Sequence, residues 1–154
     1  MSEGEGIRAF QRLSPRITTS GRLTESDLDT LAGLDVAHVV NLALADHPDI
    51  LPDEGARLAE RGISYTHIPV PFNAPGEDHF ARFVAALGDN PGPIHVHCVA
   101  NWRVSAFFYR WHRDTCRMDE GEARTLMNQQ WSPEHSDHPS ALAWVAFIAG
   151  KREY

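Results

Sequence analysis

The sequence predicts a single α/β domain of three layers, in which helices flank a mostly parallel sheet of about four to five strands. Short apolar runs of strand length alternate three times with helical patterns before residue 100, an order that builds a parallel sheet. The chain of 154 residues is long enough to bury one core without disulfides or a structural metal. After residue 103, apolar side chains cover too much of a helical pattern for a surface helix, so that helix should be central.

The chain begins with an acidic, glycine-containing stretch, residues 1–11, that we expect to be disordered or frayed. The domain is therefore expected to span residues 12–154. Residues 13–19 have the pattern of an edge strand interrupted by Pro15, because sheets tolerate proline at their edges and not within them.

The first helix is predicted from a capping box, in which Thr24 and Asp27 are spaced to satisfy each other's backbone N–H groups. This helix should end near Gly33. Residues 36–44 then form a mostly apolar run, which indicates a strand buried on both faces of a parallel sheet.

The alternation continues with a short helix between Pro52 and Gly62 and a strand over residues 63–70. The next helix carries apolar residues at helical spacing: Phe80, Phe83, Val84 and Leu87. A turn leads from it into a strand over residues 94–97. The central helix follows, and two further helices, over residues 122–130 and 139–149, should pack around it.

Cys98 directly follows the strand at residues 94–97 and precedes the central helix, so its thiol lies at a helix N-terminus. Unpaired backbone N–H groups and the helix dipole favour an anion there, whether a thiolate or a bound oxyanion. Arg103 can bind two oxygens of a phosphate-like group at once. Asn101, between them, can adopt a left-handed backbone conformation. Together these residues predict that Cys98 attacks a phosphate-like group bound by Arg103. The alternative is that Cys98 is a small buried hydrophobic residue, as lone cysteines usually are.

The run HCVANWRVS, from His97 to Ser105, resembles the phosphate-binding loop of cysteine-dependent protein tyrosine and dual-specificity phosphatases, which usually reads HCxxGxxRS. Here the loop is one residue shorter, with four residues between Cys98 and Arg103, and Asn101 stands where the family has glycine. The chain is most similar to a bacterial branch related to the phosphatase-like domain fused to beta-lactamase-type hydrolases. Other parts similar to that branch are residues 19–23, 39–42 and 65–70, Trp131 and Trp144.

The resemblance implies hydrolysis of phosphomonoesters through a cysteinyl-phosphate intermediate, without a metal or an organic cofactor. Cys98 is then the nucleophile. Arg103 binds the oxyanion, and the backbone N–H groups of the loop complete the substrate-binding set: Val99, Ala100, Asn101, Trp102 and Arg103. His97 is expected to shape the loop and support the thiolate, and Ser105 to stabilise the leaving thiolate when the intermediate is hydrolysed.

Other histidines are weaker candidates for chemistry. His95 and His97 lie two residues apart in a strand and point to the same face, a spacing that metal sites in sheets use. We expect His95 to be a packed residue and not a metal ligand. The remaining histidines have no ligand spacing and are expected at the surface.

The general acid is not evident from the sequence. In the resembling phosphatases it is an aspartic acid in the loop before the helix that precedes the catalytic strand. That loop holds Pro71 and Asn73 at the expected positions, and neither can donate a proton as an acid. Glu77 and Asp78 come later and fit the first turn of a helix, where they complement the dipole.

Asp46 is the alternative acid, since a loop that follows a parallel strand opens at the same sheet edge as the catalytic loop, with His47 beside it. Low to moderate phosphatase activity is therefore expected. Two other functions stay open. Rhodanese-like sulfurtransferases use a cysteine loop of this shorter length, and an anion-binding pseudophosphatase would keep Cys98 and Arg103 without the acid.

Composition limits the partners. The net charge of −7 and the lack of a basic stripe argue against nucleic acid, and no apolar run is long enough to span a membrane. Two cysteines and no secretory leader indicate the cytoplasm. Cys98 and Cys116 are poor disulfide partners, because the helix between them separates them by about 20 Å. A phosphorylated substrate, protein or small molecule, is expected, and the sequence does not determine the oligomeric state.

Overall fold

Five strands form one sheet in the structure, a computed structural model that describes residues 4–150. The strands are β1 Gln11–Arg12, β2 Ile17–Ser20, β3 His38–Asn41, β4 Ser64–His67 and β5 Ile94–His97. They lie side by side in the order β1-β2-β5-β3-β4, and all neighbouring pairs are parallel except β1 with β2. The predicted mostly parallel sheet of a single α/β domain is confirmed.

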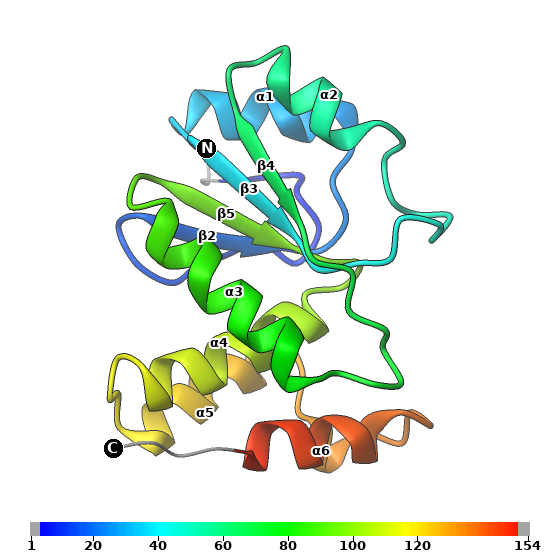
Figure 1. Cartoon of the computed structure of the whole chain (residues 1–154), viewed down its shortest axis with the longest axis vertical. Coiled ribbons are helices and arrows are strands. Elements are labelled where there is room, and N and C mark those ends of the chain that lie inside the picture. Colours follow the sequence, from blue (N-terminus) through cyan, green and yellow to red (C-terminus); the bar gives the residue numbers. More distant parts are fainter. Residues whose placement is uncertain (1–3, 151–154) are drawn as a thin grey trace.

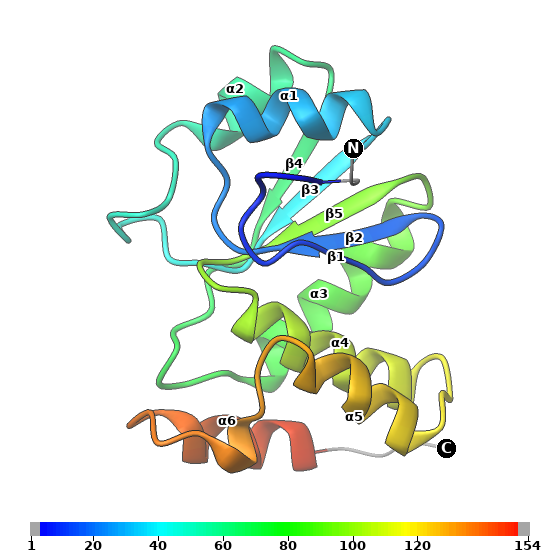
Figure 2. The same cartoon turned by 180° about the vertical axis from the view of Figure 1, so that it is seen from behind.

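Helices cover both faces of this sheet (Figure 1 and Figure 2). The helices are α1 Glu25–Gly33, α2 Glu54–Ala59, α3 Glu77–Asp89, α4 Trp102–Asp114, α5 Glu120–Asn128 and α6 Ala141–Ala149, with a 3-10 helix at Pro133–His135. The first two lie on one face, α3 and α4 lie on the other, and α5 and α6 contact the outer side of α4. The expectation that the last two helices pack around a central one is confirmed.

The predicted capping box is present at the start of α1. The Asp27 N–H donates to Thr24 Oγ1 at 3.4 Å, and the Thr24 N–H donates to Asp27 Oδ2 at 2.8 Å. The strand predicted over residues 13–19 is wrong in its place. The strand β2 begins only at Ile17, after Pro15, and lies inside the sheet between β1 and β5, so the edge strand is β1.

The packing of the N-terminal residues explains why the edge strand was predicted in the wrong place. We expected residues 1–11 to be frayed, but residues 4–11 pack on the domain, and residues 1–3 lie outside the described part. Ile7 is buried in a cluster with apolar residues of α1, and the Arg8 carbonyl accepts a hydrogen bond from the Gly21 N–H at 2.7 Å. Burial of Ile7 and the hydrogen bond of the Arg8 carbonyl therefore hold residues 4–11 on the domain, although their composition is typical of a frayed terminus.

The main core lies between the sheet and α3, α4 and α6, and a smaller core lies under α1 and α2. In α4 nearly every side chain is buried, arginines included, as expected for a central helix. Within residues 4–150 no helix combines the length and the apolar character that a membrane span requires.

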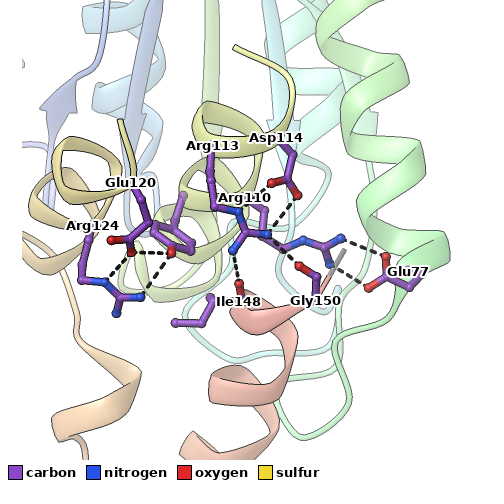
Figure 3. Close-up of polar contacts among 9 residues, drawn as sticks. Glu77, Arg110, Arg113, Asp114, Glu120, Arg124, Ile148 and Gly150 are labelled. Atoms are coloured by element: carbon purple, nitrogen blue, oxygen red, sulfur yellow. Dashed lines mark hydrogen bonds and ion pairs between the residues drawn. The ribbon is translucent and has the colours of Figure 1, made fainter. Parts of the chain in front are cut away.

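The buried arginines of α4 anchor the neighbouring helices (Figure 3). Arg110 binds both carboxylate oxygens of Glu77, at 2.7 and 2.9 Å, and so joins α4 to the start of α3. Arg113 donates to the carbonyls of Ile148 and Gly150, each at 2.7 Å, and satisfies acceptors that the end of α6 leaves open. This network joins α3 and α6 to α4.

Candidate active site

The loop between β5 and α4 lies where the carboxyl ends of the parallel strands converge (Figure 1). Residues 98–101 make the connection, and Asn101 has φ 67° and ψ 8°, the left-handed conformation that the sequence predicts. The Asn101 Nδ2 group donates to Ala9 O at 2.9 Å and to Thr19 Oγ1 at 3.0 Å. Asparagine tolerates this conformation better than most residues, and its side chain adds two bonds that glycine could not make.

Two carbonyl groups of the loop are fixed by hydrogen bonds. The Cys98 carbonyl accepts from His97 Nδ1 at 3.1 Å, and the Val99 carbonyl accepts from the Arg22 N–H at 2.9 Å. The backbone of Gly21 approaches so closely that a Cβ there would lie 2.6 Å from the Val99 oxygen. Because the described peptide bonds are trans, the N–H groups that follow these carbonyls, on Val99 and Ala100, point the opposite way.

The N–H groups of residues 99–104 consequently form a set of free donors. Within residues 4–150, none of the six donates to a protein acceptor. The first N–H groups of α4 contribute to this set because helix N-termini leave them unpaired. Convergent unpaired amides at a helix N-terminus favour the binding of an anion.

Arg103 lies over an open cavity of about 480 Å³. Its Nε–H donates to the Val70 carbonyl at 2.9 Å, and its guanidinium carbon lies 5.1 Å from the centre of the Phe72 ring. These contacts fix the arm and leave its two terminal NH₂ groups without an acceptor in the described chain. The cavity is lined by Leu44, His47, Pro71, Phe72, Asn73, Val99, Ala100, Trp102, Arg103, His138 and Ser140.

Aromatic residues make one wall of the cavity and hold the loop after β4. The Phe72 carbonyl accepts from Trp144 Nε1 at 2.6 Å, and the rings of Trp102 and Trp131 stack with centroids 4.8 Å apart. Phe72 therefore covers Arg103 from a fixed position. The wall offers a flat apolar surface beside the free guanidinium and amide groups.

Cys98 lies beneath this surface. Its exposed fraction is 0%, and its neighbours Val99 and Ala100 line the cavity while Cys98 does not. An electrophile can reach Sγ only when the atoms above it move. Burial opposes the thiolate form, and the unpaired amides and Arg103 favour it.

We expect iodoacetamide to alkylate Cys98 faster than Cys116 at pH 6.5, because unpaired amides and Arg103 lie near Cys98 and not near Cys116. Desolvation raises the pKa of the Cys116 thiol although the residue is exposed, so its thiolate is scarce at pH 6.5. Peptide mapping by mass spectrometry measures both rates. Phosphate should slow only Cys98, and equal rates at pH 6.5 would refute an activated Cys98 thiolate.

His97 and Ser105 differ in how they fit their expected roles. His97 contacts the loop through the Cys98 carbonyl, and its Nε2 lies 2.6 Å from Glu54 Oε2, a partner that sequence reasoning missed. The Ser105 hydroxyl donates its one proton to the Trp102 carbonyl at 3.0 Å. In this arrangement Ser105 does not donate to Cys98, and its expected role requires a rotated hydroxyl.

No carboxylic acid lines the described part of the cavity. Asp46 is exposed and is not a lining residue, although its neighbour His47 is. Glu77 binds Arg110 on the far side of α4, and Asp78 is exposed in the first turn of α3. The cavity wall therefore lacks the proton donor that the phosphatase mechanism uses.

Two histidines line the cavity instead. The Asp49 N–H donates to His47 Nδ1 at 3.1 Å, and the Ser140 N–H donates to His138 Nδ1 at 3.0 Å. Each Nδ1 is therefore an acceptor, and in the neutral ring the proton lies on Nε2. A neutral ring held in this way offers its Nε2–H as a hydrogen-bond donor.

The expectation that the remaining histidines lie at the surface is wrong for His38 and His112, which are buried. His138 is exposed, as expected, and lines the open cavity. Burial lowers the pKa of His112 to about 4. No spacing in the sequence identified His138 as a site residue. His138 comes from a loop 35 residues after Arg103 and contacts Phe72 only in the folded chain.

His95 is a packed residue, as expected. It is fully buried, and its two ring nitrogens lie 2.8 Å from the hydroxyls of Thr18 and Ser20. Burial, with a contribution from His97, holds its pKa well below the ordinary value. In residues 4–150 no three histidine, cysteine or acidic side chains gather as a metal site would need.

Known structures share this fold. A candidate phosphatase (DUF442) from Shewanella putrefaciens CN-32 has 28% sequence identity and a TM-score of 0.82, over 97% of each chain. TpbA of P. aeruginosa, in complex with phosphotyrosine, has 19% identity and a TM-score of 0.71, over 92% of this chain and 83% of that one. Tk-PTP in its active form has 20% identity and a TM-score of 0.69, over 91% and 95%.

Neither protein-family models nor curated protein sequences match the chain. The structural matches nevertheless confirm the resemblance to a bacterial protein tyrosine and dual-specificity phosphatase-like family. The short loop and its residues are properties of this chain, and their roles follow from the chemistry they can support.

Proposed function

We propose that the protein is a cysteine-dependent phosphatase that hydrolyses phosphomonoesters. The Cys98 thiolate attacks phosphorus, a sulfur–phosphorus bond forms, and the bond to the leaving oxygen breaks with its electron pair staying on that oxygen. Water then attacks the cysteinyl phosphate and releases phosphate and the thiolate. The observation that carries the proposal is that the cavity beside Cys98 is lined by Arg103, with its free guanidinium fork, and by loop residues Val99, Ala100 and Trp102, whose N–H groups are unpaired in the described chain.

The expected substrate is a phosphorylated protein or small molecule with an aromatic group next to the phosphate. TpbA, with a similar fold, is seen in complex with phosphotyrosine. In this chain Phe72 and Trp102 supply an apolar wall beside Arg103. Aromatic rings pack favourably against such a wall, which adds affinity that an alkyl phosphate lacks.

The enzyme should work slowly on poor leaving groups. General acid catalysis contributes about 10² to 10⁴ in rate, and no carboxylic acid lines the described cavity. A leaving oxygen that is stable as an anion needs an acid least, so activated aryl phosphates are the preferred substrates.

We therefore predict a steep dependence of kcat/KM on the leaving-group pKa. A series of substituted phenyl phosphates should lose rate strongly as the phenol becomes less acidic, and alkyl phosphates should hardly react. Release of each phenol, followed by absorbance, gives the slope. A shallow slope would mean that Asp46, Glu77 or Asp78 moves into the site and acts as the acid; variants with Asn or Gln at each position would identify it.

A second function, anion binding without turnover, is favoured by the complete burial of Cys98 and the missing acid. Tight binding of tungstate together with no release of phenol from any aryl phosphate would establish it. The sulfurtransferase alternative has its own assay, because thiocyanate formed from thiosulfate and cyanide would depend on Cys98. The phosphatase and the sulfurtransferase both require a reduced thiol, so the cytoplasm remains the expected compartment.

A further inference from the structure

A buried pair of titratable groups lies behind the loop. Glu54, at the start of α2, has an exposed fraction of 4%, and His97, at the end of β5, has 0%. Their Oε2 and Nε2 atoms are 2.6 Å apart. The second carboxylate oxygen, Oε1, is buried and has no hydrogen-bond partner in the described chain. The pair comes from segments 43 residues apart, so only the fold brings it together.

The two contacts of His97 fix its protons. Nδ1 faces the Cys98 carbonyl, which can only accept, so Nδ1 carries a proton. Nε2 faces a carboxylate at a distance typical of short charge-assisted bonds, so a second proton lies between Nε2 and Oε2. With this proton on Nε2 the ring is an imidazolium and the pair is a buried salt bridge, whereas with the proton on Oε2 the pair is neutral.

Within residues 4–150, no arginine or lysine forms an ion pair with Glu54. Burial, together with the negative charge of Glu54, raises the pKa of Tyr65 to about 12, so this phenol stays neutral. His95 stacks on His97 with ring centroids 6.5 Å apart, and its lowered pKa keeps it neutral as well. Asn41 donates to the Tyr65 hydroxyl at 3.2 Å and carries no charge. A buried carboxylate needs a cationic partner, and His97 is the group in contact.

We propose that Glu54 is a positioning residue of the catalytic loop, which holds His97 as an imidazolium so that its Nδ1–H fixes the Cys98 carbonyl. Fixing this carbonyl turns the following N–H, on Val99, toward the anion side of the loop. The charge of the imidazolium strengthens that hydrogen bond beyond the bond of a neutral ring. The effect on turnover rests on the proposed phosphatase function, whereas the effects on protonation and anion binding do not.

The protonation of His97 is measurable without any variant. In protein with ¹⁵N-labelled histidine, both ring nitrogens of His97 should give signals of protonated nitrogen at pH 7.5. An ordinary histidine titrates near pH 6.5 and is mostly neutral at pH 7.5, so the result is diagnostic. The signals are assigned by their loss in His97→Asn. A neutral ring with one unprotonated nitrogen would overturn the proposal.

Glu54→Gln tests the role of the charge, since the amide has the same shape and can still donate to a neutral His97. We expect the His97 ring to become neutral and the dissociation constant for tungstate, from calorimetry, to rise about tenfold. Glu60→Gln is the matched control, because Glu60 lies on the exposed end of the same helix. Unchanged tungstate affinity in Glu54→Gln would overturn the proposal.

The two proposals fail in different ways. Doubly protonated His97 and weaker tungstate binding in Glu54→Gln, without phenol release by the wild type, would refute the phosphatase and support the positioning role. Turnover that Glu54→Gln leaves unchanged, with unchanged tungstate affinity, would refute the positioning role and support the phosphatase.

Discussion

Cys98→Ser is expected to lower the hydrolysis of aryl phosphates by at least about 10³-fold, because a serine hydroxyl at this position has no base to take its proton. The loop amides and Arg103 remain, so phosphate should bind with an affinity close to that of the wild type. Stopped-flow or absorbance assays with an activated phenyl phosphate measure turnover, and calorimetry measures phosphate binding. The combination of lost turnover and retained binding separates the nucleophile from the anion ligands.

Cys116→Ser is the control for this experiment, since Cys116 is an exposed cysteine just past the end of α4. It should keep full activity. Turnover retained in Cys98→Ser would exclude the cysteinyl-phosphate mechanism. Loss of phosphate binding in the same variant, with folding intact by circular dichroism, would mean that the sulfur itself holds the loop open.

Arg103→Lys should weaken tungstate binding by about ten- to a hundredfold, although the charge is kept. An ammonium group cannot present two parallel N–H donors, and each charge-assisted hydrogen bond contributes about 1.5–3 kcal/mol. The lysine also loses the Nε–H bond to the Val70 carbonyl that fixes the arm over the cavity. Calorimetric titration with tungstate gives the ratio of dissociation constants.

Arg82→Lys provides the matched comparison, because Arg82 is exposed on α3 and does not line the cavity. Its tungstate affinity should equal that of the wild type. An Arg103→Lys protein that binds tungstate normally would show that the guanidinium does not contact the anion, and the proposed site would then reduce to the loop amides.

Much of the fold was readable from local pattern. The capping box of Thr24 and Asp27 marked the start of α1, and the strand at residues 94–97 was predicted with its exact bounds. Both features depend only on nearby residues. A capping box requires two residues that lie three positions apart, and a buried parallel strand requires one continuous run of apolar residues. The N-terminal segment was predicted wrongly because its burial depends on partners in α1 and in the loop, which lie far from it in the chain.

The sequence by itself determined the chemistry of the loop. It places a cysteine directly after a strand, an asparagine that can adopt the left-handed backbone conformation, and an arginine in the first turn of a helix. Only the tertiary structure decided what surrounds these residues. Phe72, His138 and Glu54 come from three different loops or helix ends. Phe72 meets Arg103, His138 meets Phe72, and Glu54 meets His97 only through packing. The physical reason is that backbone geometry and helix termini follow from neighbouring residues, whereas cavity walls and buried ion pairs depend on contacts between segments that the chain order does not specify.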